Sequence, residues 1–489
     1  MSGKKPMKKP APKPAKAAKP AAPAPVAAGV VPIKKRTVPT PQTPRGMKDI
    51  LPSEAKYWRA VRTAGERLAA AYGFEWIETP IVEETALFVR GVGKQTDIVE
   101  KEMFSFIDQG GDEMTLRPEA TAAIARAYIN HGMLNMPQPV KLFYHGTMFR
   151  HERPQAGRYR QFHQFGFETI GEQKPVVDAE LIICAHRFFV DLGLQVKVEV
   201  NSIGTVNDRE QYREKLVAYY RQHRSVLCEN CKVRLTKNPL RVLDCKEPGC
   251  EPLKQGAPQI VDVLSEDSKN HFMKVLEYLE DAEVPFELNP YLVRGLDYYS
   301  HTVFEVVFPA RGEGATKSAA AAGGRYDGLI ELLGGRPTPG AGFAIGLERT
   351  ILEMKERQII PLDDSKPVVF LAQLGEPAKR KAFKVFDDLR RAGIPAAVAF
   401  SKDALKAQME VANRLGVKYT LLIGQKEVLD GTIIIRDMEA GIQEMVDANK
   451  VTSEIAKKLV TAPLAPLTAP APRDTVSEES SRKEGDFSG

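Results

Sequence analysis

Residues 140 to 170 contain two strand-like runs joined by a short basic segment. The runs are Val140–Glu152 and Gln161–Ile170, and the segment between them, Arg153–Arg160, carries three arginines together with Pro154 and Gly157. Two such runs around a turn-forming segment predict a long antiparallel hairpin. The hairpin is expected to present a flexible, positively charged loop at one end.

The second run of the hairpin places polar side chains on one face. Side chains two residues apart share a face of a strand, so one face is lined by Phe162, Gln164 and Glu168, while Phe165 and Phe167 line the other. A core-facing strand would not carry Gln and Glu, and a solvated one would not begin with Phe, so the face indicates a binding site. The alternative is the exposed polar face of an ordinary amphipathic strand.

Other parts of the first 365 residues show helical or strand patterns. Helices are predicted at Ser53–Tyr72, with Ser53 as its cap, and at Glu119–Tyr128. Strand-like patterns occur at Phe74–Pro80, at Leu292–Phe308 and at the glycine-rich start of Gly340–Met354, which continues as a helix. Residues 205 to 285 are charged and helical around four cysteines, and they are interpreted as an insertion within the larger domain.

Strands alternate with amphipathic helices in the last third of the chain. The order is strand, helix, strand, helix, strand over Val368–Gln373, Ala378–Arg391, Ala396–Phe400, Ala404–Leu415 and Tyr419–Ile423. This alternation predicts a separate, doubly wound α/β domain.

The two ends of the chain differ in composition from the rest. Of 489 residues with a net charge of +6, residues 1–43 hold ten Lys and Arg and no acid, so the remainder carries −4. That Lys/Pro/Ala-rich tail and residues 461–489 are expected to be disordered. The tail lacks the features of a secretory or transit signal, and no run approaches the roughly 18 apolar residues of a membrane span, so a cytoplasmic protein without membrane insertion is expected. The lysines are either a solvated tail or an arm that adds affinity for an RNA backbone.

The hairpin resembles motif 2 of the class II aminoacyl-tRNA synthetases. The resemblance lies in Phe149-Arg150-His151-Glu152, the basic loop and the aromatic residue on the returning strand. It implies an ATP site in which Arg150 neutralises the α-phosphate, Glu152 accepts from the adenine amino group and Phe162 stacks on the purine. Arg158 would reach the polyphosphate from the loop.

Two further segments are similar to the remaining class II motifs. Gly340-Ala-Gly-Phe-Ala-Ile-Gly-Leu-Glu-Arg349 resembles motif 3, which places Arg349 in a first helical turn beside the triphosphate. A surface arginine is the alternative for this motif taken alone. The stretch ending at Pro80 is similar to motif 1 and implies a homodimer.

Three segments resemble the histidine-specific signatures and the substrate loop of histidyl-tRNA synthetases. They are Thr115-Leu-Arg-Pro-Glu-Ala-Thr121, Arg294-Gly-Leu-Asp-Tyr-Tyr299 and Ala322-Gly-Gly-Arg-Tyr-Asp-Gly328, with Ala120 standing where glycine is expected. An imidazole has one donor and one acceptor nitrogen, so selecting it needs polar groups on opposite sides. By this resemblance histidine is bound by Glu119, Thr121, Arg150, Gln164, Glu168, Arg294, Tyr298 and Tyr299.

The resemblance also implies the fold, the reaction and the partners. It implies an α+β class II catalytic domain at 44–365, with a mixed, mainly antiparallel sheet, flanking helices and the helical insertion, followed by an α/β anticodon-binding domain at 366–460. Histidine would be activated by ATP with Mg²⁺ and then transferred to the 3′ end of its tRNA. Because both reactants are anionic, catalysis should depend on the positive charges of Arg150, Arg294 and Arg349. Gln155 would contact the acceptor stem of the tRNA.

Four cysteines have the spacing of a zinc ribbon. Cys228-x2-Cys231 and Cys245-x4-Cys250 are two pairs separated by thirteen residues, whereas Cys184 stands apart. The second pair is looser than the usual two-residue gap, so a structural zinc and four free thiols both stay open.

Two other functions are compatible with parts of the sequence. Synthetase-like regulatory subunits of histidine biosynthesis share the catalytic fold but lack the C-terminal module and much of the ATP-binding set, both of which are present here. A general RNA-binding protein would depend on the basic tail alone.

Overall fold

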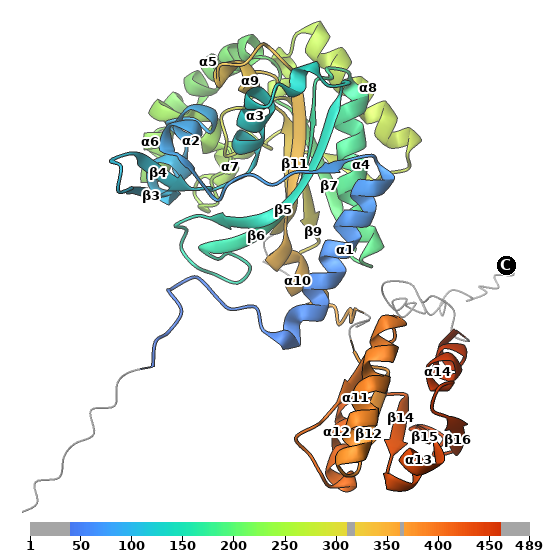
Figure 1. Cartoon of the computed structure of the whole chain (residues 1–489). Helices are drawn as coiled ribbons and strands as arrows, with labels where there is room; N and C mark the ends of the chain where they lie inside the picture. The colour runs from blue at the N-terminus through green and yellow to red at the C-terminus, as the bar shows by residue number, and fades with distance from the viewer. Residues whose placement is uncertain (1–39, 311–317, 362–365, 461–489) are drawn as a thin grey trace, which may run out of the picture. The chain divides into compact units, whose positions relative to one another are not determined.

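The first domain is built on an eight-stranded sheet in a computed structural model that describes residues 40–310, 318–361 and 366–460 (Figure 1). The strand order is β1-β5-β6-β11-β10-β9-β7-β8. In that order the strands span Glu75–Trp76, Val140–Phe149, Gln161–Ile170, Gly340–Gly346, Ser318–Arg325, Ser300–Phe308, Lys197–Ser202 and Phe286–Leu288. The edge strands β1 and β8 pair in parallel, and all other pairs are antiparallel. The prediction of a mixed, mainly antiparallel sheet is confirmed.

The predicted hairpin is the pair β5 and β6. It pairs without interruption from Val140 opposite Ile170 to Phe149 opposite Gln161. Phe165 and Phe167 are buried in the main core, as their alternation predicts. Arg150 and Glu152 lie beyond the last strand residue, where the chain enters the basic loop.

Four helices cover the face of the sheet that carries Phe165 and Phe167. They are α1 (Ala55–Ala71), α4 (Pro175–Asp191), α8 (Glu266–Asp281) and α10 (Leu347–Glu356). Apolar side chains of all four share one core with the sheet, and Figure 1 shows α1, α4 and α8 along the same side. The opposite face, which carries Tyr144, packs against a second apolar cluster.

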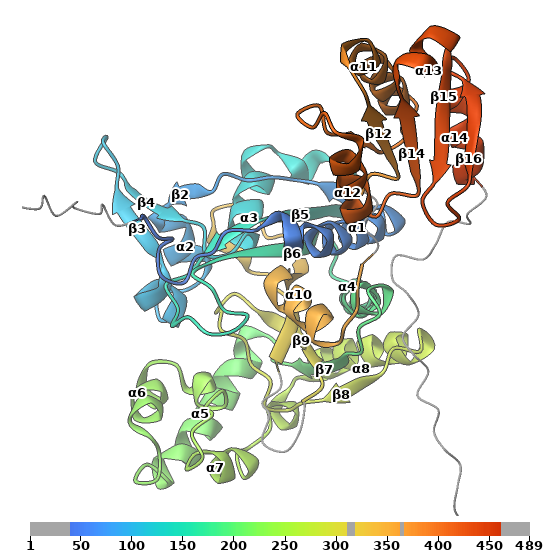
Figure 2. The same ribbon diagram turned by 90° about the horizontal axis from the view of Figure 1, so that it is seen from below.

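The predicted insertion contains two groups of helices that pack differently. The 3-10 turns η4 (Pro239–Val242) and η5 (Ile260–Val263) and the helices α5 (Val206–Gln222), α6 (Glu229–Lys237) and α7 (Glu251–Gln255) lie together, as Figure 2 shows for the three helices. By contrast, Phe272 and Val275 of α8 are buried in the main core beside α4. Helix α8 therefore packs as part of the sheet layer.

A small three-stranded sheet lies before the hairpin and was not predicted. Its order is β2-β4-β3, with strands Val82–Glu84, Glu113–Leu116 and Phe104–Ile107. It is accompanied by α2 (Thr85–Gly91), the π-helix η2 (Ile98–Glu102), α3 (Thr121–Asn130), the 3-10 turn η3 (Met133–Asn135) and, later in the chain, α9 (Leu329–Leu332). Helix α3 confirms the helix predicted near Glu119–Tyr128.

The second domain has a five-stranded sheet in the order β13-β12-β14-β15-β16. Strands β12 (Val369–Gln373), β13 (Ala396–Val398) and β14 (Tyr419–Ile423) are parallel and alternate with α11 (Glu376–Arg391) and α12 (Leu405–Leu415). The predicted α/β alternation is confirmed over this part. An antiparallel hairpin of β15 (Thr432–Asp437) and β16 (Gln443–Asp447), with α13 (Gln425–Asp430) and α14 (Val451–Val460), completes the domain and was not predicted.

Three local predictions are wrong. Ser53 does not cap α1, because it lies inside the 3-10 turn η1 (Pro52–Glu54) and Glu54 occupies the cap position. Residues 292–299 form no strand: β9 begins at Ser300, after a turn at Asp297 and Tyr298. The strand predicted at Phe74–Pro80 is reduced to the two residues of β1.

The predicted tails fall outside the described residues, except for residues 40–43. Within the described part of the chain, no helix is both long enough and apolar enough to cross a membrane.

Candidate active site

A pocket of about 270 Å³ opens on the sheet face opposite the main core. It lies among the hairpin, the start of α3, the segment before β9, and strands β10 and β11. The structure brings eleven of the predicted ligand residues together in its lining: Glu119, Thr121, Arg150, Glu152, Arg158, Phe162, Gln164, Arg294, Tyr298, Tyr299 and Arg349. Glu168 lies beneath this lining. Gln155 is in an adjoining, larger groove that shares Arg158, Glu305 and Arg349 with the pocket.

Glu168 is the most deeply buried acid beneath the pocket. Its side chain is 1% exposed and accepts hydrogen bonds from Thr121 Oγ1 at 2.8 Å and Tyr326 Oη at 2.6 Å. Burial raises the pKa of Glu168 to about 8. Gly342 pairs with Glu168 across β6 and β11, and a Cβ there would lie only 1.8 Å from Glu168 Oε2, so this glycine is required for close packing.

Glu119 has a structural task in addition to its place on the pocket wall. Its carboxylate accepts the backbone N–H groups of Thr121 at 2.8 Å and Ala122 at 2.9 Å, which caps the start of α3. Burial raises the pKa of Glu119. Ala120, where glycine was expected, has φ of −107°, so alanine fits without strain.

The two tyrosines of the segment before β9 do not contact Glu168. Tyr298 Oη donates to Glu119 Oε2 at 3.5 Å, and the Tyr299 ring lies against the Arg294 guanidinium at 5.6 Å. The tyrosine that reaches Glu168 is Tyr326, which the sequence interpretation missed. It belongs to the Ala322–Gly328 signature, so the signal was present but was not assigned to this residue.

Arg150 and Glu152 lie at the mouth of the hairpin. Arg150 Nε donates to the carbonyl oxygen of Pro118 at 2.8 Å, and its guanidinium lies 5.4 Å from the centre of the Phe162 ring. Glu152 is within 4.0 Å of Arg150 Nη1 and 3.4 Å of Arg158 Nη1. These contacts hold two cations and one acid around the same open side of the pocket.

Arg349 is fixed by backbone contacts from two sides. Its Nη1 donates to Ala319 O at 2.6 Å and its Nε to Gly157 O at 3.3 Å, and burial lowers its pKa. The preceding residue, Glu348, accepts from the backbone N–H of His163 at 2.9 Å and lies 2.7 Å from His163 Nδ1. Helix α10 is thereby tied to β6 beside the pocket.

Arg294 is buried against an acid that the sequence interpretation also missed. Its guanidinium forms an ion pair with Glu305 of β9, and its Nε has no hydrogen-bond partner among the described residues. Glu305 belongs to both the pocket and the adjoining groove. Its position in the alternation of β9 could have indicated that it faces the site.

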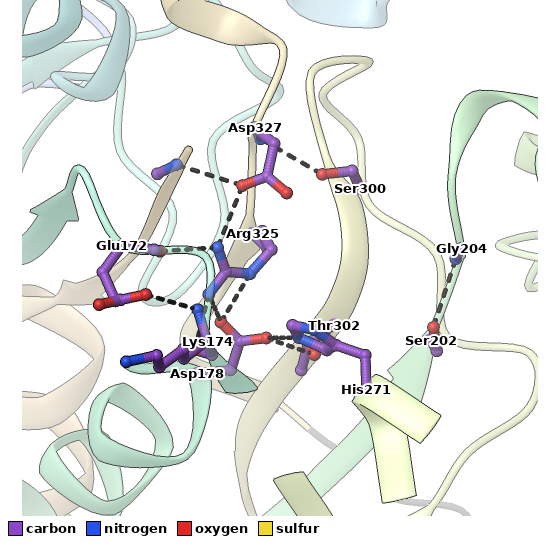
Figure 3. Close-up of polar contacts among 11 residues, drawn as sticks. Glu172, Lys174, Asp178, Ser202, Gly204, His271, Ser300, Thr302, Arg325 and Asp327 are labelled. Atoms are coloured by element: carbon purple, nitrogen blue, oxygen red, sulfur yellow. Dashed lines mark hydrogen bonds and ion pairs between the residues drawn. The ribbon is translucent and has the colours of Figure 1, made fainter. Parts of the chain in front are cut away.

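A buried ion pair anchors the chain next to Tyr326 (Figure 3). Asp178 of α4 accepts from Arg325 Nε at 2.9 Å and from Thr302 Oγ1 at 2.7 Å, and it lies 2.7 Å from His271 Nε2. Burial alone would raise the pKa of Asp178, but Arg325 and His271 hold it below its ordinary value. The pair links α4, α8, β9 and β10, so the backbone that carries Tyr326 is held from several sides.

The four cysteines of the insertion are brought together. The Sγ atoms of Cys228, Cys231, Cys245 and Cys250 all lie within 4.8 Å of one another, and those of Cys228 and Cys245 are 3.8 Å apart. A tetrahedral zinc with Zn–S bonds of about 2.3 Å requires sulfur atoms roughly 3.8 Å apart. The geometry therefore fits a four-thiolate metal site. Cys184 is buried far along the sequence in the main core.

Comparison with known proteins agrees with this geometry over both domains. A family model described as Histidyl-tRNA synthetase matches residues 46–350, and a model described as Anticodon binding domain matches residues 358–458. The chain is 48% identical over 419 residues to the histidine–tRNA ligase of Dehalococcoides mccartyi, covering 86% of this chain and 100% of that protein. It is also 48% identical to that of Pelotomaculum thermopropionicum, covering 85% and 97%.

A solved structure shows the same arrangement. The crystal structure of the apo histidyl-tRNA synthetase of S. aureus superposes with a TM-score of 0.71 at 37% identity, covering 84% of this chain and 99% of that one. The sequence and structural matches span the catalytic and the anticodon-binding domains together. This chain belongs to the histidyl-tRNA synthetase family.

Proposed function

We propose that the chain activates histidine with ATP, forming histidyl-adenylate and pyrophosphate, and then transfers histidine to the 3′ end of its tRNA. The observation that carries the proposal is the single pocket in which Arg150, Arg294 and Arg349 surround a space bordered by the buried Glu168. Fixed cations suit a reaction between two anions, and a buried carboxyl group suits an imidazole.

ATP is assigned to the open side of the pocket. Phe162 offers its ring to the purine and Glu152 its carboxylate to the adenine amino group. Arg150 and Arg349 are assigned to the α-phosphate and the γ-phosphate side, and Arg158 to the polyphosphate from the loop. These cations are already held by backbone carbonyl groups, so little reorganisation is needed when ATP binds.

Histidine is assigned to the inner side of the pocket. Glu168 is placed to bind one ring nitrogen, with Tyr326 and Thr121 orienting its carboxyl group. Gln164 Oε1 is buried and has no partner among the described residues, so it can accept from the substrate ammonium together with Glu119. Tyr298 and Tyr299 close the pocket around the ring.

Arg294 is assigned to the reacting atoms. Its guanidinium would leave Glu305 to lie between the histidine carboxylate and the α-phosphate, where it neutralises charge as the new bond forms. Glu305 is an oxygen ligand of the type that Mg²⁺ prefers and lies at the polyphosphate side. Mg²⁺ would supply additional positive charge to the polyphosphate.

A histidine-dependent exchange of pyrophosphate into ATP tests the reaction. The parent protein is expected to exchange only when histidine, Mg²⁺ and ATP are all present. A synthetase-like regulatory subunit or a general RNA-binding protein would show no such exchange, and that result would reject the proposal.

The basic hairpin loop is assigned to the acceptor stem of histidine tRNA. Gln155 is exposed and lies in the groove next to the pocket. Changing Gln155 to alanine is expected to slow transfer to tRNA by about 10-fold and pyrophosphate exchange by less than about twofold, since it removes one or two contacts to RNA alone. Single-turnover transfer from preformed adenylate measures the first rate. Equal slowing of both steps would count against the assignment.

The cysteine cluster is assigned to a structural zinc. Protein purified without a histidine tag is expected to contain about one zinc per chain, and Cys231→Ser to lose it and unfold at lower temperature, because metal binding contributes to folding. Elemental analysis and a thermal melt measure these two effects, with Cys184→Ser as the matched control that keeps the metal. Metal-free protein with four titratable thiols would show that the cysteines are free.

The resemblance of the segment ending at Pro80 to a dimer motif supports a homodimer. Strand β1 is an edge strand, and Trp76 beside it is 56% exposed. An exposed tryptophan on an unpaired sheet edge is typical of a surface that another chain covers.

A further inference from the structure

We propose that Arg241, on the turn η4 of the insertion, is a positioning residue for the segment that carries Arg294. The inference depends on the role proposed for Arg294 in adenylate formation. It assigns to the insertion a part in the first reaction step, which uses no tRNA.

The segment 293–299 has no regular secondary structure and needs outside contacts to hold its shape. Asp297 donates its backbone N–H to Val92 O at 3.1 Å, and its side chain accepts from Asn238 Nδ2 at 3.1 Å. Arg209 of α5 donates to the carbonyl oxygen of Tyr299. Two of these three contacts come from the insertion, at residues 209 and 238.

Arg241 packs directly against this segment. A Cβ added to Gly295 would lie 3.0 Å from Arg241 Nη1 and 3.9 Å from Nη2, so the guanidinium lies on the glycine backbone one residue after Arg294. Arg241 Nη1 donates to Asp244 Oδ2 at 2.6 Å, and Nη2 donates to Asp97 Oδ2 at 3.1 Å. Two carboxylates on two segments therefore fix the plane of the guanidinium.

The same ion network reaches the ATP-binding hairpin. Asp97 directly precedes η2, and the last residue of η2, Glu102, accepts the backbone N–H of His151 at 2.7 Å. Arg234 of α6 supports both partners, since it donates to Arg241 O at 3.2 Å and lies 3.6 Å from Asp97. Arg241 therefore connects the Arg294 segment to the residue next to Arg150.

The far end of the turn is fixed by the cysteine cluster. Val242 and Leu243 are buried, and Asp244 is followed by Cys245, a member of the cluster. Arg241 lines the adjoining groove and not the catalytic pocket. Its effect on adenylate formation must therefore pass through the position of Arg294.

Arg241→Ala is expected to lower the kcat of histidine-dependent pyrophosphate exchange by about 10- to 100-fold, because small displacements of a catalytic group have effects of this size. The KM values for ATP and histidine should change by less than about threefold. Arg241→Lys should recover part of the rate, since lysine can reach one carboxylate but cannot lie flat on Gly295. Rates are normalised to competent sites by the burst of histidyl-adenylate, which separates slow enzyme from unfolded enzyme.

Two further variants test how Arg241 acts. Lys232→Ala removes an insertion cation whose ion pair is local, with Glu229, and should exchange at the parent rate. Asp97→Asn combined with Arg241→Ala should be little worse than Arg241→Ala alone, because the two residues share one contact.

The inference is overturned by any of three results. The first is an exchange rate per competent site within about twofold of the parent. The second is additive losses for Asp97→Asn and Arg241→Ala. The third is a loss confined to the KM for tRNA, which would make Arg241 an RNA contact. If the parent protein itself does not exchange pyrophosphate, the proposed function fails and not this inference.

Discussion

Arg294→Ala is expected to reduce histidine-dependent pyrophosphate exchange by at least about 100-fold, the typical loss when one preorganised charge donor is removed from a transition state. Arg294 is buried beside the pocket, and Glu305 is its charged partner in the free protein. Its cation becomes most valuable when the histidine carboxylate and the α-phosphate approach each other. The loss should therefore appear mainly in kcat, with a smaller change in the KM for ATP.

Two comparisons make the Arg294 experiment specific. Arg213→Ala removes an exposed arginine of α5 and should leave the exchange rate unchanged. Arg294→Lys keeps the charge but loses the planar group that can contact two oxygens, so it should recover only part of the rate. Exchange by Arg294→Ala at close to the parent rate would remove Arg294 from the mechanism.

Glu168→Gln is expected to raise the KM for histidine by about 100-fold or more. The carboxyl group is buried, and its two hydrogen bonds from Thr121 and Tyr326 fix its orientation toward the pocket. A glutamine keeps the shape but has an amide in place of one oxygen, so it leaves a buried donor or acceptor unpaired. Steady-state exchange at varied histidine concentration measures the effect, and Glu66→Gln on α1, an exposed acid, is the matched control.

The same carboxyl group predicts how histidine affinity depends on pH. Burial raises the pKa of Glu168 to about 8, whereas a free imidazole titrates near 6.5. A buried pair without net charge is favoured, so the complex should hold one proton shared by the ring and the carboxyl group. Between roughly 6.5 and 8 the separate partners also hold one proton, and the affinity should be flat.

The affinity should weaken on both sides of that window. Below about 6.5 the free ring is protonated, so binding must release a proton, and above about 8 the free carboxyl is ionised, so binding must take one up. Calorimetric titration of histidine into the parent and Glu168→Gln measures this, and the variant should lose the weakening near pH 8. An affinity that instead tightens as the pH rises through 8 would mean that the bound pair holds no proton.

Local sequence determined much of the fold and most of the pocket. The alternation around Phe162 and Gln164 set which side chains of β6 face the pocket, because a strand fixes this with a period of two residues. The motif resemblances located the loop and the arginines. The same local rules did not reveal the small sheet of β2, β3 and β4, whose short strands carry little periodic signal.

Tertiary structure alone decided which groups meet. Glu168 and Tyr326 are 158 residues apart in sequence, yet they are hydrogen-bonded because β6 and β11 lie side by side and Tyr326 closes the turn between β10 and β11. The contact of Arg241 with Gly295, like its bond to Asp97, depends on where the insertion packs. A sequence pattern fixes the direction of a side chain within its own element, whereas its partner depends on the packing of distant elements.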